Sequence, residues 1–130
     1  MTLRLRSVIG VFLIALVSTA TRADQAPALN RVMREKLDHA KGILAAVVTS
    51  DWPLLDRESR ALVLATRDPA WLVLTDPEYL RQSDAFAGSL QKLIEASGRK
   101  DLDAAATAEV SLTKSCVQCH KYMARRRVAR

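Results

Sequence analysis

The segment 28–48, ALNRVMREKLDHAKGILAAVV, decides the fold class, because its apolar side chains recur at the spacing of an α-helix. Steps of three and four residues bring side chains onto one face of a helix. Six apolar residues of the segment follow those steps: Leu29, Met33, Leu37, Ala40, Leu44 and Val47. We therefore predict a helix from Ala28 to Val48 that buries this stripe.

Two more helices follow, separated by a proline-containing connection. Asp51 can cap the second helix, Pro53 is tolerated in its first turn, and Pro69 predicts that it ends near Arg67. The third helix begins after Asp76, another capping residue. The expected buried faces contain Leu55, Leu62 and Ala65 in the second helix, and Tyr79, Phe86, Leu90 and Leu93 in the third.

The third helix is expected to end at Gly98, a suitable left-handed terminator, and Asp101 can cap a fourth helix. The predicted stripe of the fourth helix contains Leu102, Ala105, Leu112, Cys116, Cys119 and Met123. The connection 68–75 carries Trp71 and other apolar side chains, so we expect it to lie over the core.

The composition fits one packed helical domain. The chain has 130 residues, of which 49 % are apolar and 26 % charged, with only 4 Gly and 4 Pro. These values exclude a second full-size domain, a disordered chain and a collagen-like chain. No segment alternates with the period of a strand. We predict an all-α fold, an antiparallel four-helix bundle.

The first 23 residues have the pattern of a secretory signal peptide. Two arginines precede the uncharged run 7–20, whose apolar part is shorter than the ~20 residues that cross a bilayer. Small residues at Thr21 and Ala23 predict cleavage before Asp24, against the alternatives of an uncleaved anchor or a buried helix. The mature domain, 24–130, would then be periplasmic and would keep no stable membrane anchor.

The charge of the mature chain is modest. The full sequence carries +6, and cleavage after residue 23 would leave 17 basic and 14 acidic residues, or +3. This excess does not indicate a nucleic-acid partner. Six basic residues still gather near the C-terminus: Lys114, Lys121, Arg125, Arg126, Arg127 and Arg130. They predict a basic surface that recruits an acidic partner, or alternatively a solvated tail.

The only two cysteines of the chain, Cys116 and Cys119, lie three residues apart, and His120 follows directly. This is the C-x-x-C-H haem-attachment spacing. On one helical face, two thiols can add to the two vinyl groups of a haem while the adjacent imidazole reaches the iron. The sequence predicts one covalently bound haem c per chain, attached through both cysteines near the end of the last helix, with His120 as the proximal ligand.

Three other interpretations of the cysteines are weaker. A disulfide between Cys116 and Cys119 would be strained within a helix. A thioredoxin-like dithiol requires a preceding strand, and the sequence predicts none. A zinc site lacks the second pair of Cys or His ligands that would complete a tetrahedron.

A four-helix bundle with C-x-x-C-H near the end of the last helix resembles the cytochrome c prime family, over the whole mature chain. The segment 31–34, Arg-Val-Met-Arg, adds a resemblance to the low-spin members, in which a methionine on the first helix is the sixth iron ligand. The resemblance therefore implies that Met33 ligates the iron opposite His120. It also implies a homodimer through the first two helices.

Other assignments of the sixth position remain open at this point. Met33 could be an ordinary core residue beside a vacant, gas-binding iron site. Met123 lies on the helix of His120, hence on the same side of the iron, and is expected to fill core space. His39 is expected to leave the buried stripe and lie at the surface, although imidazole is a good iron ligand.

The sequence contains no evident acid–base pair, nucleophile or substrate pocket, so we predict that the protein is not an enzyme. A haem with His and Met ligands favours one-electron transfer. The predicted function is a periplasmic electron carrier that exchanges electrons with redox partner proteins. The alternative is a high-spin cytochrome c prime-like protein that binds nitric oxide or carbon monoxide.

Overall fold

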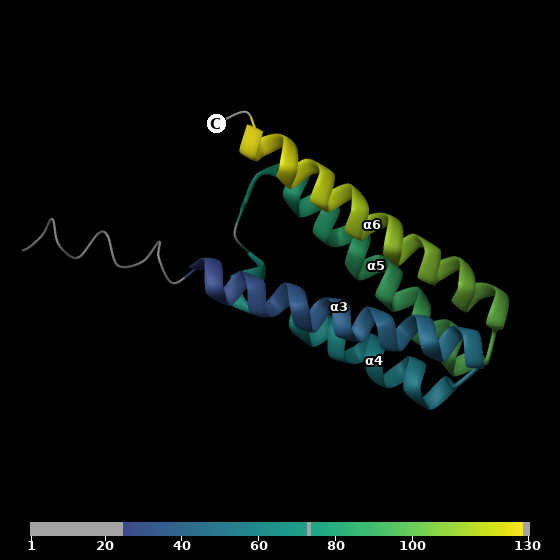
Figure 1. Ribbon diagram of the computed structural model, residues 1–130. Coiled ribbons are helices and arrows are strands. Elements are labelled where there is room, and N and C mark those ends of the chain that lie inside the picture. The colour runs from purple at the N-terminus through teal and green to yellow at the C-terminus, as the bar shows by residue number, and fades with distance from the viewer. Residues whose placement is uncertain (1–24, 73, 129–130) are drawn as a thin grey trace, which may run out of the picture.

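Figure 1 shows the computed structural model, which describes residues 25–72 and 74–128. Over these residues the chain forms four α-helices and a short 3-10 helix, with no strand: α3 (Gln25–Thr49), α4 (Trp52–Ala65), η1 (Pro69–Trp71), α5 (Pro77–Arg99) and α6 (Leu102–Val128). The prediction of an all-helical bundle is confirmed. No described helix is long and apolar enough to cross a membrane. The predicted signal peptide, 1–23, lies outside the described residues.

The three predicted capping aspartates all hold helix starts. Asp51 accepts a hydrogen bond from the Leu54 amide (3.0 Å), and Asp76 accepts one from the amide of Tyr79 (3.0 Å). Asp101 does the same for the first turn of α6. Each carboxylate satisfies a backbone N–H that has no partner within the helix.

The third helix does not end at Gly98, as the sequence suggested. The left-handed residue is Lys100 (φ 53°), and its amide bonds back to the last turn of α5. Ser50 (φ 55°) has the same conformation after α3. In both connections the following aspartate amide reaches back into the preceding helix, to Ala46 at 2.9 Å and to Ala96 at 3.0 Å. Hydrogen bonding of the aspartate therefore fixes the turn, without a glycine.

The core consists of apolar side chains from all four α-helices and of Trp71 from η1: Val32, Ile43, Ala46, Val47, Leu55, Leu62, Trp71, Phe86, Leu90, Leu93, Ala96, Ala105, Ala108 and Leu112. The predicted buried residues of α4 and α5 are confirmed. The stripe predicted for the first helix is wrong at Leu37 and Leu44, which are 55 % and 50 % exposed. Leu102 of α6 is also exposed, contrary to prediction.

The buried face of α3 includes charged side chains that find partners inside the bundle. His39 Nδ1 lies 2.6 Å from Glu58 Oε2 on α4. A Cβ atom at Gly42 would lie 2.9 Å from the Glu58 side chain, so this glycine leaves room for the glutamate. Lys36 is 7 % exposed and lies over two aromatic rings. These contacts let α3 bury the face that contains Lys36 and His39, and the leucine stripe turns outward.

One end of the bundle collects the start of α3, η1, the start of α5 and the end of α6 (Figure 1). Arg31 of α3 donates to Asp68 at 2.5 Å, which fixes the segment before η1. Helices that follow one another in the chain pack closely, whereas α3 and α6 make much less contact with each other. The candidate site lies at this end of the bundle.

Candidate haem site

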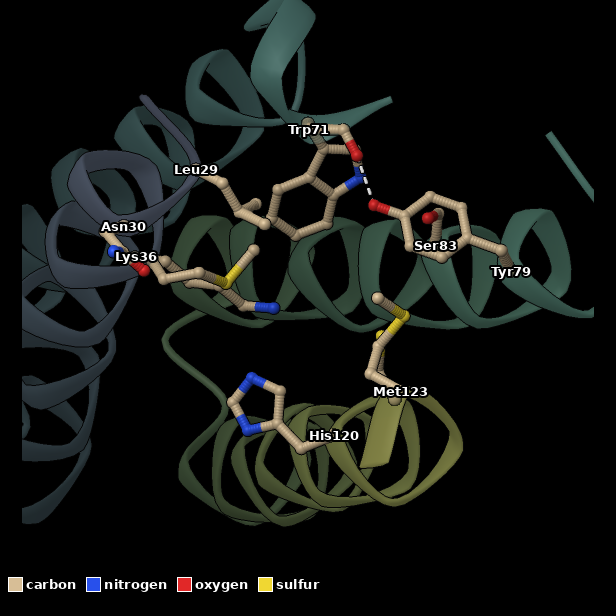
Figure 2. A pocket seen from close by; sticks show the side chains of 10 residues that line it. Leu29, Asn30, Lys36, Trp71, Tyr79, Ser83, His120 and Met123 are labelled. Carbon is tan, nitrogen blue, oxygen red and sulfur yellow. Dashed lines mark hydrogen bonds between the residues drawn. The ribbon is translucent and has the colours of Figure 1, made fainter. Parts of the chain in front are cut away.

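A pocket of about 130 Å³ opens between α3, η1, α5 and α6 (Figure 2). Its walls contain apolar, aromatic and thioether side chains together with two potential iron-binding groups or cations: Leu29, Asn30, Met33, Lys36, Trp71, Tyr79, Ser83, Cys119, His120 and Met123. The structure thus brings Met33, Cys119 and His120 to one cavity, although Met33 is separated from the other two by most of the chain.

The last turns of α6 supply the residues of the C-x-x-C-H motif. Cys116 and Cys119 are both free thiols and both half-buried. Cys119 lines the pocket, whereas Cys116 packs against the hydrophobic core. Burial raises the pKa of the Cys119 thiol. His120 is exposed, lines the pocket, and has no hydrogen-bond or ion-pair partner among the described residues. Its imidazole is therefore available for a ligand.

The α3 wall of the pocket carries Met33 and Lys36, one helical turn apart. Met33 is half-buried and packs against the core. Lys36 is almost fully buried, and in Figure 2 its amine and the His120 ring extend toward each other from opposite walls. The sequence reasoning singled out Met33 but not Lys36. A lysine among apolar neighbours was the available signal, and it was passed over because lysines are normally exposed.

Two predictions about other side chains have different outcomes. His39 is not a surface residue, because its side chain is 27 % exposed and bonds to Glu58. That contact directs it toward α4, and it is absent from the pocket lining. Met123 lines the pocket from α6, the same helix that carries His120, in agreement with its predicted side.

Trp71 and Tyr79 close the pocket at the η1 end. The Trp71 ring is 5 % exposed and lies 5.3 Å from the Phe86 ring, measured between centroids. The Tyr79 hydroxyl donates to the Trp71 carbonyl, as the dashed line in Figure 2 shows. The expectation that connection 68–75 covers the core is confirmed at Trp71, and this wall is rigidly tied to α5.

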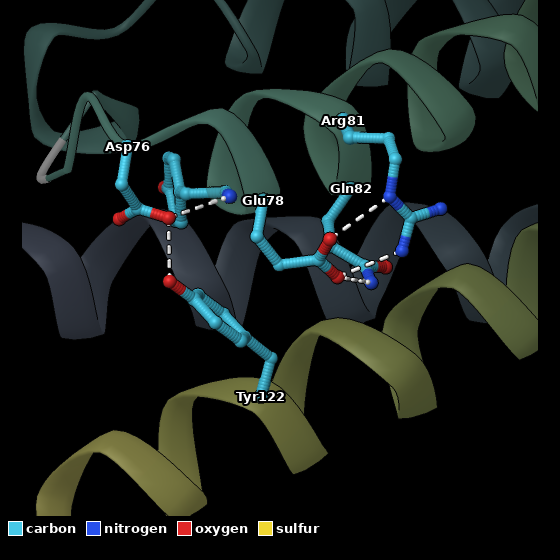
Figure 3. Close-up of polar contacts among 6 residues, drawn as sticks. Asp76, Glu78, Arg81, Gln82 and Tyr122 are labelled. Atoms are coloured by element: carbon cyan, nitrogen blue, oxygen red, sulfur yellow. Dashed lines mark hydrogen bonds and ion pairs between the residues drawn. The ribbon is translucent and has the colours of Figure 1, made fainter.

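A second polar cluster holds the end of α6 against the start of α5 (Figure 3). The Tyr122 hydroxyl donates to Asp76 at 2.5 Å, and Arg126 forms an ion pair with the same carboxylate. The Tyr122 hydrogen bond is the main cause of the lowered pKa of Asp76. Because Tyr122 lies two residues after His120, this cluster fixes the helical turn that presents the imidazole.

The predicted basic surface is only partly a free one. Lys114, Lys121 and Arg125 are exposed on α6. Arg126 is engaged by Asp76. The side chain of Arg127 and the whole of Arg130 lie outside the described residues. Three exposed cations therefore remain near the attachment motif.

The chemistry of the pocket walls fits a haem. Two free thiols and an unpartnered imidazole lie on consecutive turns of α6, and a thioether faces the same cavity. Within residues 25–72 and 74–128 no group of three or more His, Cys, Asp or Glu side chains could hold a bare metal ion. No family model, curated protein or solved structure matches this chain.

Proposed function

We propose that this protein is a periplasmic c-type cytochrome that carries one electron on a haem attached to Cys116 and Cys119. One observation carries the proposal: the free thiol of Cys119, the unpartnered imidazole of His120 and the thioether of Met33 line the same pocket. The fold we propose for the holoprotein is an antiparallel four-helix bundle resembling the cytochrome c prime family.

His120 would hold the iron from the α6 side and Met33 from the α3 side. A haem supplies a one-electron couple, and a thioether ligand favours its reduced state. Trp71 and Leu29 give the cavity an apolar wall that limits access of water. His39 takes no part in ligation in this proposal, because Glu58 holds its ring between α3 and α4.

A porphyrin is larger than the pocket of about 130 Å³, so the holoprotein requires α3 and α6 to lie farther apart near His120. This is the pair of helices with little mutual contact, and separating it costs little packing. The loose packing of α3 against α6 therefore supports insertion of the ring between these two helices.

The test is mass spectrometry and visible spectroscopy of the protein matured with the haem-attachment machinery. We expect one haem per chain and a low-spin spectrum, and the double variant Cys116→Ala/Cys119→Ala should have the bare polypeptide mass. An unmodified wild-type mass would rule the proposal out. A haem-loaded but high-spin wild type would instead favour the alternative, a gas-binding protein with a vacant site beside Met33.

Lys121 and Arg125 extend the proposal to the redox partner. Both are exposed near the attachment motif, so an acidic protein would be attracted to this end of the bundle. Electron-transfer rates with an acidic redox protein should fall as ionic strength rises. Rates independent of salt would leave these residues without a recruiting role.

A further inference from the structure

Lys36 is the least expected side chain in the pocket. A lysine is rarely buried unless it is paired, yet this one is 7 % exposed and has no hydrogen bond or ion pair with any described residue. Burial lowers the pKa of Lys36 from its usual value. A cation kept in such a place without an acidic partner indicates that something negative, or something that becomes more negative, occupies the cavity beside it.

Two aromatic rings hold the ammonium group. Lys36 Nζ lies 3.9 Å from the centroid of Phe86 and 4.5 Å from that of Trp71. The faces of aromatic rings attract cations, and this attraction is larger when water is excluded. The Phe86 and Trp71 rings therefore favour the charged form of Lys36 and fix its position, while the amine still reaches the pocket lining.

We propose that Lys36 is the fixed positive charge of this pocket, which stabilises an added electron on the haem and, where Met33 is removed, a small anion bound at the vacated side. The inference rests on the proposed function, because it assigns an electrostatic role toward the haem. Lys36 acts here as a positioning and tuning residue. The physical reason is that a charge in a medium of low dielectric interacts strongly with any change of charge nearby.

The first experiment measures the midpoint reduction potential of the haem-loaded protein. Lys36→Leu removes the charge and suits the aromatic surroundings, and Lys36→Arg retains the charge. The control is Lys41→Gln on the same helix, where the lysine side chain is 65 % exposed. We expect a lower potential for Lys36→Leu, near-wild-type values for Lys36→Arg, and almost no change for Lys41→Gln because solvent screens that charge.

The second experiment uses azide as the anionic probe and carbon monoxide as the neutral one, both in a Met33→Ala background. Adding Lys36→Leu should weaken azide binding to the ferric protein by about tenfold or more, as expected for losing a charged partner. Carbon monoxide affinity of the ferrous protein should change little. A packing role for Lys36 would alter both ligands alike.

Each other result has a definite meaning. A haem-loaded Lys36→Leu protein with an unchanged potential and unchanged azide affinity would overturn this inference and leave the proposed function standing. If Met33→Ala stays low-spin and only the Met33→Ala/Lys36→Leu variant becomes high-spin, Lys36 is an iron ligand and the inference is wrong. A wild type without haem would overturn the proposed function together with the inference.

Discussion

The two ends of the bundle are built differently. At the end with the Ser50 and Lys100 turns, Ile43, Leu55 and Leu93 are fully buried. At the other end Met33 and Cys119 are only half-buried, and His120 is exposed. The first end is completed by its own side chains, whereas the second leaves apolar and ligand-forming groups around a cavity. The comparison indicates that the pocket end needs an additional apolar body to finish its core.

The largest expected effect is loss of the haem itself. Cys116→Ala/Cys119→Ala should contain no haem, and amide hydrogen exchange should become faster around the end of α6 and η1 than at the Ser50 and Lys100 turns. Exchange measured by mass spectrometry compares the two ends within one sample. Equal loss of protection at both ends would contradict the proposed difference between them.

A core substitution at the turn end should cost nearly as much. Leu55 is fully buried in α4, so Leu55→Ala should lower the free energy of unfolding by about 2–5 kcal/mol. Leu64 of the same helix is 62 % exposed, and Leu64→Ala is the matched control, with an expected change within about 0.5 kcal/mol. Denaturant unfolding measures both, and similar values for the two variants would show that the turn end is not packed as described.

At the pocket end, Met33→Ala should have a smaller effect on stability and a specific effect on the iron. Met33 is half-buried, so we expect a cost near the lower limit for such changes, about 2 kcal/mol. The ferrous haem should become high-spin and bind carbon monoxide. Carbon monoxide titration of wild type and variant provides the measurement, and a wild type that already binds the gas readily would remove Met33 from the ligand set.

The sequence was sufficient for the elements that depend on local signals. Asp51, Asp76 and Asp101 cap the helices as predicted, because a capping carboxylate needs only its own first turn. The attachment motif is equally local, since Cys116, Cys119 and His120 form one short segment. The pairing of Met33 with this segment could be predicted only through the resemblance to a known family.

The buried face of α3 could not be predicted in this way, because the helix carries two apolar stripes. The stripe with Leu37 and Leu44 is the more regular one in the sequence. The bundle buries the other, since Glu58 on α4 and the aromatic rings of Phe86 and Trp71 accept His39 and Lys36. Those partners lie 19 residues or more away along the chain, beyond the reach of periodicity.

Asp76 gives a smaller, pH-dependent test of the pocket end. Its pKa is lowered in the folded protein, first by the Tyr122 hydrogen bond. The contribution to stability is therefore present above the unfolded value of about 3.9 and is lost as the pH falls through the folded pKa. Asp76→Asn keeps a capping side chain, so it should be less stable than wild type at neutral pH and approach it in strong acid.

Thermal unfolding between neutral pH and about pH 2 follows this difference. Asp51→Asn is the control, because Asp51 caps α4 at the turn end without an arginine or tyrosine partner among the described contacts. If the two variants show the same pH dependence, the Tyr122 and Arg126 contacts do not carry the effect.

The smallest expected effect on monomer stability concerns the outward stripe of α3. Leu37, Leu44 and Val48 are 55 %, 50 % and 75 % exposed, an apolar surface outside both ends of the core. Leu44→Lys should change the free energy of unfolding of the monomer by no more than about 0.5 kcal/mol. The resemblance implies a dimer through α3 and α4, and in that case a lysine at this position would place a charge inside the interface.

Analytical ultracentrifugation over a range of concentrations distinguishes these two consequences. We expect the wild type to be dimeric and Leu44→Lys to shift toward monomer, whereas Val110→Lys on α6, where the valine is 55 % exposed, should leave the dimer intact. The comparison is matched because both substitutions put the same charge on a half-exposed apolar position of a long helix. A wild type that is monomeric throughout would show that the leucine stripe is simply solvated, and that the outward turn of α3 results from the partners of Lys36 and His39 alone.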